Sequence, residues 1–467
     1  LAIERLVPEM DVLSLKAIRE NYLPLFALTY SNSDTNNPGT WGVEGSNIRQ
    51  KYDNLSFNVT QRFAWGTSIG ATLYSRMTDT TRAYSLINPS YNSTFQFNLT
   101  QPLLRGFGDK AANVEAIKAA RTIQIADASL RATAFQTIYQ VEEAYWGLVA
   151  ARENLKVQES SLAGSRDLLA RTRAGARIGT ESGVEVLNAE TEVARYEDAV
   201  LSAARIIQSR EDQLKKLLNF PAGDGERLVP LDQPTVELRN VSAEEILRIA
   251  LDNRPEMETA RRRAENSRTD VDYYRNQSLP RLDLSLQFWA LGVSGVKYVY
   301  QDNNPLTGIV IDKIVGGRGE SFSDILKGKY KNWSVNLTLE VPLWGMLSRS
   351  GLARSKAAEE QARLQMEKQK RDIEFEVQDI VRELAAKARI IASSTRYREL
   401  AEKQVASETQ RYQQGLVGSE WLFKYRQDLA NARSAEIQAV VDYRIALARL
   451  DRIRGTSPAL ASAGIGN

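Results

Sequence analysis

One segment of the chain occurs twice, and this repeat strongly constrains how the chain folds. Residues 173–194, RAGARIGTESGVEVLNAETEVA, return in altered form at residues 410–430, QRYQQGLVGSEWLFKYRQDLA. In each copy a long segment with apolar periodicity reaches a glycine, Gly179 or Gly415, and a second helical segment follows, so the offset is 415 − 179 = 236 residues. A repeat on this scale predicts two copies of one long helical hairpin, whose helices need neighbours to bury their apolar stripes.

The same offset relates further apolar positions, and it predicts one elongated body of two structural repeats. The matched pairs are Val141 and Val377, Leu148 and Leu384, Leu214 and Leu450, and Ala194 and Ala430. The first repeat covers 1–219, with a helix, strands within 25–104 and a helical hairpin over 105–219. The second covers 220–455, with a linker and short helix over 220–254, a helix over 255–279, strands within 280–343 and a hairpin over 344–455. A flexible tail follows over 456–467.

The helical segments are recognised by the spacing of their apolar residues. From Asp109 to about Ala174 these recur three, four or seven positions apart, which is typical of a coiled-coil seam. They are Ile138, Val141, Tyr145, Leu148, Leu155, Leu162 and Leu169. In the short helix that we expect at 241–253, Ser242 and Glu245 have the spacing of a capping box.

Other segments alternate apolar with small or polar residues and are rich in Tyr, Phe and Thr, which is typical of strands. The expected strands are Leu25–Tyr30, Asn54–Phe63, Ser68–Ser75 and Ser93–Leu103 in the first half, and Arg281–Leu291 and Asn332–Val341 in the second. Such strands suit a tilted membrane crossing of about 10 residues. Residues 292–331 are expected to form a long polar loop.

The number of strands itself indicates an oligomer. Four strands from one chain cannot close a barrel, and open sheet edges are not tolerated in lipid. Several chains must therefore combine, with four strands each, or with six each if Asn54–Phe63 and Ser68–Ser75 also cross. Both strand numbers remain open at this point.

Composition excludes several classes of protein. The chain has neither cysteine nor histidine, so it has no disulfide, no thiolate metal site, no Ser–His–Asp constellation and no histidine as a general base. Its 61 basic and 58 acidic residues are interleaved, which gives no basic patch for nucleic acid. The sequence contains no run of 18 apolar residues, so we expect no ordinary transmembrane helix. Since the chain begins at Leu1, we expect a signal peptide upstream.

Taken in order, the motifs of the chain resemble those of the TolC family of outer-membrane efflux channels. The motifs are TQPLLRG at 100–106, VLNAE at 186–190, NRPE at 253–256, SLPRLDLSL at 278–286, VPLWG at 341–345 and YQQGL at 412–416. They cover nearly the whole chain. The resemblance implies an α+β membrane protein that forms a homotrimer. Its trimeric α-helical coiled-coil barrel, the periplasmic tunnel, is continuous with a shared transmembrane antiparallel β-barrel of 12 strands.

The resemblance also implies a function. The chain is expected to be a passive exit duct in the outer membrane of a Gram-negative (diderm) bacterium, spanning into the periplasm. It would serve a tripartite efflux system, including multidrug export, or type I secretion. Its partners would be outer-membrane lipid, a periplasmic adaptor (membrane fusion protein) and an inner-membrane RND or ABC pump, with no nucleic acid. No enzymatic activity, catalytic residue, cofactor or metal is expected.

Two sets of residues at the hairpin tips follow from the resemblance. Adaptor docking is expected at the glycine turns, Ile178, Gly179 and Thr180 in the first hairpin and Gly415, Leu416 and Val417 in the second. The tip gate is expected to comprise Glu185, Tyr412, Trp421, Lys424 and Arg426.

The expected gate departs from the family pattern in its charges. Family members commonly carry an acidic ring after the turn. Glu185 matches this ring in the first repeat, but Trp421 and Lys424 occupy the matching positions of the second. Trp421 could form an apolar constriction, and Glu185 could pair with Lys424 or Arg426 across neighbouring hairpins. The simpler interpretation has Trp421 packed between helices and Lys424 solvated.

Other functions fit the sequence less well. A non-channel coiled-coil scaffold of the cell envelope would leave the apolar strand faces without a cover. A nucleotide site at IVGGRGES, residues 314–321, lacks the GxxxxGK[ST] pattern, so this segment is expected to be an external loop tip. Carboxylates scattered beside Lys and Arg along the helices indicate solvated faces rather than a catalytic dyad.

Overall fold

The computed structural model describes residues 1–39, 47–82, 85–221, 223, 225–233, 235, 237–239, 241–341 and 346–456. The expected tail beyond residue 456 and residues 342–345 of the VPLWG motif lie outside this description. The chain divides into two compact units. Unit 1 comprises 1–6, 125–261 and 364–467, and unit 2 comprises 7–124 and 262–363. Each is described by itself.

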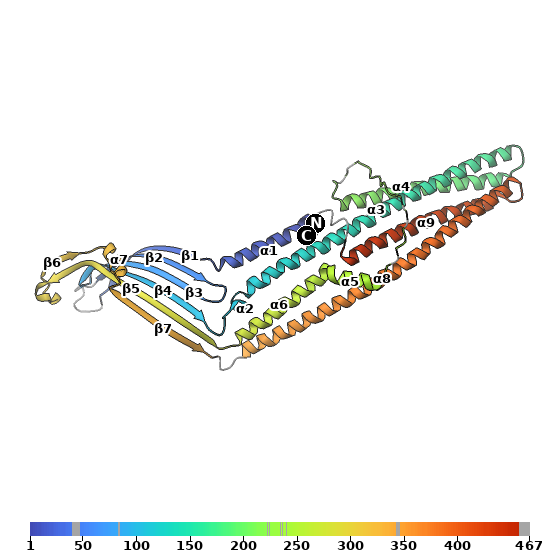
Figure 1. Cartoon of the computed structure of the whole chain (residues 1–467). Coiled ribbons are helices and arrows are strands. Elements are labelled where there is room, and N and C mark those ends of the chain that lie inside the picture. Colours follow the sequence, from blue (N-terminus) through green and yellow to red (C-terminus); the bar gives the residue numbers. More distant parts are fainter. Residues whose placement is uncertain are drawn as a thin grey trace. The chain divides into compact units, whose positions relative to one another are not determined.

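Unit 2 contains one antiparallel sheet, drawn with its helices in Figure 1. Its strands are β1 (Leu25–Pro38), β2 (Asn47–Arg62), β3 (Ser68–Thr80), β4 (Ile87–Pro102), β5 (Arg281–Tyr300), β6 (Val310–Val315) and β7 (Tyr330–Glu340). Strands β1 to β5 follow one another in the sheet, and β6 and β7 both pair with β5. All six segments expected from the sequence are therefore strands. Several are longer than the apolar alternation indicates, because polar residues continue the ladder: Ser31 of β1 still pairs with Asn54 of β2.

The prediction of a long polar loop over 292–331 is wrong, because most of this range forms strands and helices. Strand β5 continues to Tyr300, and short 3-10 helices (η1, Gln301–Asn303; η2, Pro305–Thr307), β6 and the helix α7 (Arg318–Leu326) follow. The segment IVGGRGES is therefore the end of β6 and the start of α7 rather than a loop tip. Helix α7 packs on the sheet through buried hydroxyl groups, because Ser93 of β4 lies 2.7 Å from Ser321 of α7 between their Oγ atoms.

The helices of unit 2 lie next to the strands in the sequence, some before a strand and some after one. They are α1 (Ala2–Glu20), α2 (Asp109–Ala112), the first part of α3 (Val114–Arg177), most of α6 (Pro255–Gln277) and the start of α8 (Met346–Gln413). Lys118 of α3 and Asp270 of α6 form an ion pair of 2.8 Å. Arg121 of α3 donates to the Thr269 hydroxyl of α6 at 2.6 Å. Polar contacts thus join α3 to α6 at mostly half-exposed positions.

Unit 1 contains two long helical hairpins. The first joins the rest of α3 to α4 (Gly183–Leu217), and the second joins the rest of α8 to α9 (Ser419–Arg454), with α5 (Ala243–Asn253) beside the second (Figure 1). The core of the second is formed by Ile246 and Ala250 of α5, Ile373, Val377, Ile380 and Leu384 of α8, and Tyr443, Ala446, Leu447, Leu450 and Ile453 of α9. The first has a smaller core of Ala144, Leu148 and Leu214, with Val141, Ile207 and Leu217 packed against it. Each of these six residues corresponds to a residue of the larger core after 236 positions.

The C-terminal ends of α4 and α9 have the same type of cap, at positions that are 236 residues apart. Asn219 follows α4 with φ 60°, and Gly455 follows α9 with φ 65°. The amide of Phe220 donates to the Lys215 carbonyl at 3.0 Å, and that of Thr456 donates to the Asp451 carbonyl at 3.3 Å. These are the bonds of a Schellman cap, which satisfies carbonyls that the helix leaves unpaired. In the part of the chain that is described, no helix combines the length and apolar character needed to cross a membrane.

Candidate functional site

The two hairpin tips, residues 178–182 and 414–418, end their first helices with the same cap. Gly179 has φ 82° and Gly415 has φ 70°, a region that L-residues with a side chain rarely adopt. The Thr180 amide donates to the Gly175 carbonyl at 3.0 Å, and the Leu416 amide donates to the Arg411 carbonyl at 3.0 Å. Both glycines are therefore needed to end their helices, independently of any partner.

The second helices of the two hairpins begin differently. Ser182 caps α4 and accepts a hydrogen bond from the Glu185 amide at 3.2 Å, and the Glu185 carboxylate accepts one from the Ser182 amide. Helix α9 begins after Gly418, which has no side chain to cap it, and the Ser419 hydroxyl is buried with no hydrogen-bond partner among the described residues. Glu185 thus takes part in a local capping box.

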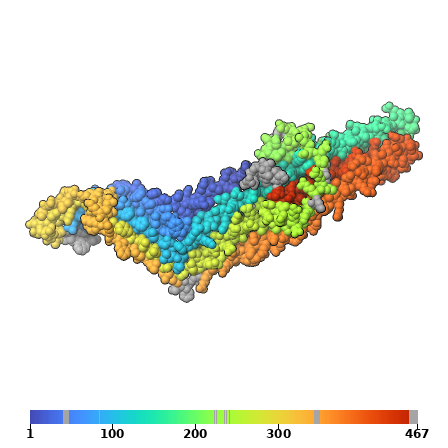
Figure 2. Space-filling model, viewed as in Figure 1, coloured from blue at the N-terminus to red at the C-terminus, as the bar shows by residue number. Residues whose placement is uncertain are grey.

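The two tips contact each other through an apolar cluster and a hydrogen bond. Leu168, Ala189, Leu422 and Phe423 form the buried cluster, with Leu169 and Tyr412 packed against it. The Tyr412 phenol donates to the Glu181 carboxylate at 3.0 Å. Burial raises the pKa of Tyr412, the hydrogen bond with Thr172 lowers it, and the bond to Glu181 raises it. Figure 2 shows the two tips, teal and orange-red, lying against one another at the end of the hairpins.

The three remaining gate residues lie on α9 and contact groups of their own chain. Arg426 donates to the Gly164 carbonyl at 2.6 Å. Burial lowers the pKa of Arg426, and the charge of Asp167 partly opposes that effect. The Lys424 ammonium lies 5.2 Å from the centre of the Trp421 ring, which stacks at 6.1 Å on Tyr425.

The six expected docking residues form the outer surface of the tips. Ile178 is 77% exposed and Leu416 is 65% exposed, while Val417 is half-buried. Gly179, Thr180 and Gly415 are also exposed. Two exposed aliphatic side chains thus lie beside caps with fixed backbone geometry.

The structure brings Tyr412 together with a residue that sequence reasoning missed. Glu181 follows the first turn by two positions, but its partner is 231 residues away, so no local pattern marks it. The capping box of Ser182 and Glu185 was also missed, although its S-x-x-E spacing is visible in the sequence. In this single chain Glu185 has no ion pair with Lys424 or Arg426 among the described residues.

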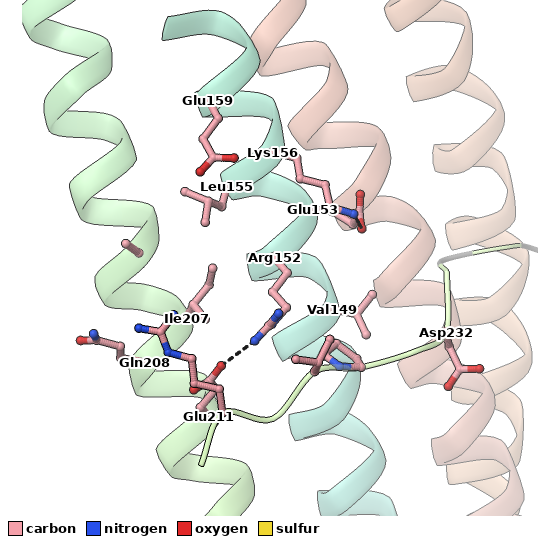
Figure 3. Close-up of a pocket in the computed structure, with 14 residues that line it drawn as sticks. Val149, Arg152, Glu153, Leu155, Lys156, Glu159, Ile207, Gln208, Glu211 and Asp232 are labelled. Carbon is pink, nitrogen blue, oxygen red and sulfur yellow. Dashed lines mark hydrogen bonds and ion pairs between the residues drawn. The ribbon is translucent and has the colours of Figure 1, made fainter. Parts of the chain in front are cut away.

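A pocket of about 450 Å³ lies in unit 1 between α3, α4 and the linker that follows α4. As Figure 3 shows, Arg152 of α3 faces Glu211 of α4, and the two form an ion pair of 2.8 Å. Arg152 also donates to the Leu228 carbonyl of the linker at 2.7 Å. The pocket is thus a place where the linker is fastened to the first hairpin. Among the described residues, no group of three acidic side chains suits a metal ion.

Comparison with known proteins agrees with this geometry. The family model described as "Outer membrane efflux protein" matches residues 59–219 and 246–456. The solved outer-membrane channel OprN has 16% sequence identity and a TM-score of 0.68, over 98% of this chain and 86% of that one. The outer membrane protein VceC of Vibrio cholerae has 15% identity and a TM-score of 0.66, over 98% and 93%. The open-state MtrE outer membrane channel of Neisseria gonorrhoeae has 16% identity and a TM-score of 0.60, over 97% and 85%. No curated protein matches significantly by sequence. The expected fold, long helices with antiparallel strands as in TolC-like channels, is confirmed.

Proposed function

The chain belongs to the outer membrane efflux protein family, and from this premise we propose that it is the exit duct of a tripartite efflux or type I secretion system. Membership makes it an efflux channel of the Gram-negative outer membrane that extends into the periplasm, and a transport protein rather than an enzyme. The observation that carries the proposal is the pair of hairpin tips, which are capped, in contact and outwardly exposed.

The duct is a homotrimer whose three copies complete one barrel and one helical tunnel. Exposed apolar side chains along the hairpins support this assembly, because a neighbouring copy would cover them. They include Leu187 and Leu201 on α4 and Phe375, Ile390 and Leu400 on α8. The sheet supports it as well, since its backbone edges need partners in lipid.

The tips form a gate that is closed when nothing is bound. Tyr412 and Glu181 link the two hairpins of one chain. Trp421 forms an apolar constriction around the axis. Lys424 is the cation that reaches Glu185 of a neighbouring hairpin, because Arg426 is already held at the Gly164 carbonyl. A Lys424 that pairs in this way would leave the face of Trp421.

Docking opens this gate. A periplasmic adaptor contacts the two exposed turns, Ile178–Thr180 and Gly415–Val417, and an inner-membrane RND or ABC pump supplies the energy. Exposed Ile178 and Leu416 give the adaptor an apolar contact. Gly179 and Gly415 have no side chain, so the adaptor can approach the backbone of each turn closely.

We also propose the division into two structural repeats, 1–219 and 220–455. The equivalent core residues and the helix ends at Asn219 and Gly455 support it. The strand content differs between the halves, since β1 to β4 fall in the first and β5 to β7 in the second.

The proposed function is tested by expressing the chain in a Gram-negative host that lacks its own exit channel and provides an adaptor and a pump. We expect a detergent-extracted trimer from the outer membrane and restored export of a fluorescent dye. If the protein fails to restore export with an RND pump and with an ABC pump, and carries no current in bilayers, a scaffold of the cell envelope would be favoured instead.

A further inference from the structure

We propose that each chain contributes six membrane-crossing strands, so that a trimer closes a barrel of 18 strands rather than 12. The six are β1 to β5 and β7. The inference rests on the proposed trimer, but it concerns the surface through which the copies join and the width of the barrel. It selects the larger of the two strand numbers that the sequence left open.

The six strands share one continuous apolar face. Residues paired directly across antiparallel strands lie on the same face of a sheet. Leu28 of β1 pairs with Phe57 of β2, Phe57 with Leu73 of β3, and Leu73 with Phe95 of β4. The next residues of this face continue across the other strands: Phe97 pairs with Phe288 of β5, and Phe288 pairs with Trp333 of β7.

The opposite face of the same six strands is polar. Its paired rows are Thr29 with Ser56, Asn58 with Thr72, Thr72 with Gln96, Asn98 with Gln287, and Gln287 with Ser334. An apolar face toward lipid and a polar face toward the lumen is the pattern of transmembrane barrel strands. Strands β1 and β2 share it where Phe26–Tyr30 pairs with Leu55–Val59, so they belong to the wall. Each of the six strands has at least 11 residues, enough for one crossing.

Strand β1 and most of β2 precede the residues that the family model matches, since the match begins at residue 59. The matched part contains β3, β4, β5 and β7, which would be four strands per chain. In that arrangement β3 would be an edge, but its outer side is fully paired with β2 from Gln50 to Arg62. A second chain therefore cannot pair with β3 unless β2 leaves it.

The apolar residues shift along the strands across the sheet, as the tilt of barrel strands requires. The row that contains Leu28 passes through Phe95 to Ala290 of β5 and Lys331 of β7. The apolar residues of β7 lie nearer its helix end, at Trp333, Val335, Leu337 and Leu339. An apolar belt that crosses tilted strands would shift in this way.

Helix α7 marks where this belt ends on the side away from the helices. The apolar face beyond Phe95 changes to Ser75, Ser93 and Gly292, and α7 covers it. A Cβ atom on Gly292 would come within 1.8 Å of the Ser321 carbonyl oxygen. Protein rather than lipid thus covers the sheet above Phe95.

The free edges of the sheet are complementary. Among the described strands, β1 pairs only with β2 and β7 only with β5. Strand β1 runs away from its helix α1, and β7 runs toward α8, so β7 of one copy and β1 of the next are antiparallel when the copies surround an axis. Pairing them satisfies the edge groups of both. Barrels of 16–18 strands leave an aqueous channel, so the duct would be wide at its outer end.

Electron cryomicroscopy of the purified oligomer tests the proposal by a count of strands in a section through the barrel. We expect 18. A trimer with 12 would overturn the inference and leave the export channel intact, whereas a single chain without a closed barrel would overturn both.

Cysteine pairs test the edge itself, because the chain has no native cysteine. Ala27→Cys on β1 is combined in turn with Ser334→Cys, Asn336→Cys and Thr338→Cys on β7, all on the polar face. Oxidation should link neighbouring chains in at least one combination. The matched control replaces Ala27→Cys with Thr72→Cys on β3, which should give no link. Links from β3, or none from any β1 pair, would overturn the proposal.

Discussion

The Tyr412 phenol donates a hydrogen bond of 3.0 Å to the Glu181 carboxylate, and this bond joins two turns whose glycines are 236 residues apart. Tyr412 is also packed against the buried cluster of Leu168, Leu422 and Phe423. A hydrogen bond to a charged group contributes about 1.5–3 kcal/mol. A motion that separates the two tips must break this bond and divide the apolar cluster, because Leu168 belongs to the first hairpin and Leu422 to the second.

Tyr412→Phe should weaken the closed tip while it retains the packing of the ring. Loss of about 1.5–3 kcal/mol from the closed state would raise the open fraction by about tenfold or more. The measurement is the sensitivity of the expressing host to an antibiotic too large for ordinary porins, which should rise. Tyr397→Phe, at an exposed position of α8, is the control and should leave sensitivity unchanged. Equal sensitivity of both variants would contradict a gating role for the bond.

Ile178→Ser combined with Leu416→Ser should abolish adaptor-dependent export without loss of the folded protein. Both side chains are exposed, so little packing is removed, and surface changes usually cost within about 0.5 kcal/mol. The measurement is dye export together with the apparent melting temperature. Leu231→Ser, in the linker at 92% exposure, is the matched control. Undiminished export by the double variant would exclude these side chains from docking.

Leu148→Ala and Leu384→Ala should each destabilise the chain by about 2–5 kcal/mol, because each leaves a cavity in a packed core. The two leucines occupy equivalent cores of the two hairpins. Denaturant unfolding of the purified oligomer measures the loss. Leu231→Ala, which removes an exposed side chain, should cost far less. A loss confined to one leucine would argue against equivalent roles in the two repeats.

Glu142→Gln should stabilise the chain at neutral pH but not in acid. Burial raises the pKa of Glu142, and the charge of Asp451 raises it further. Because the folded pKa exceeds the unfolded one, the stabilisation from protonation is present below the ordinary glutamate pKa and is lost as pH rises through the raised value. A higher melting temperature is expected near pH 7.5, with no gain near pH 4.

Glu143→Gln is the control for this change, since Glu143 directly follows Glu142 in α3 but is exposed. Because Glu143 is exposed, its replacement should change the melting temperature little. A gain for Glu142→Gln that is equal at both pH values would contradict burial as the cause.

Gly292→Ala should displace α7 from the sheet, since the added methyl group would meet the Ser321 carbonyl oxygen. Limited trypsin digestion should then cut at Arg318 or Lys327 faster than in the wild type. Gly70→Ala, a strand glycine whose nearest neighbour would be 3.8 Å away, is the control. Unchanged digestion of Gly292→Ala would show that α7 is not fixed at this point.

The spacing of apolar residues predicted the long hairpins and the six long strands. An element with one apolar face repeats its apolar residues at a regular interval, and this interval differs between helices and strands. Such spacing could not predict α7 and β6: residues 292–331 mix glycine, charge and short apolar runs, and α7 is held by buried serines rather than by an apolar stripe. The polar second half of β1 was missed for a related reason, since its ladder depends on β2 and not on side-chain pattern.

The candidate site was predictable only where the signal is local. Gly179 and Gly415 mark the turns in the sequence. The hydrogen bond from Tyr412 to Glu181, in contrast, depends on how the two hairpins pack against each other. The spacing of Ser242 and Glu245 predicted a capping box, yet Ser242 caps α5 without a side-chain hydrogen bond. The same spacing at Ser182 and Glu185 does form one. The S-x-x-E motif therefore shows that a capping box is possible, and the surrounding structure determines whether its hydrogen bonds form.

A pore closed by its own hairpin tips is tested by the single-channel conductance of the purified oligomer in planar lipid bilayers. We expect discrete openings of small conductance for the wild type and larger, longer openings for Tyr412→Phe. Bilayers that contain the inserted oligomer but carry no current with either protein would contradict this expectation.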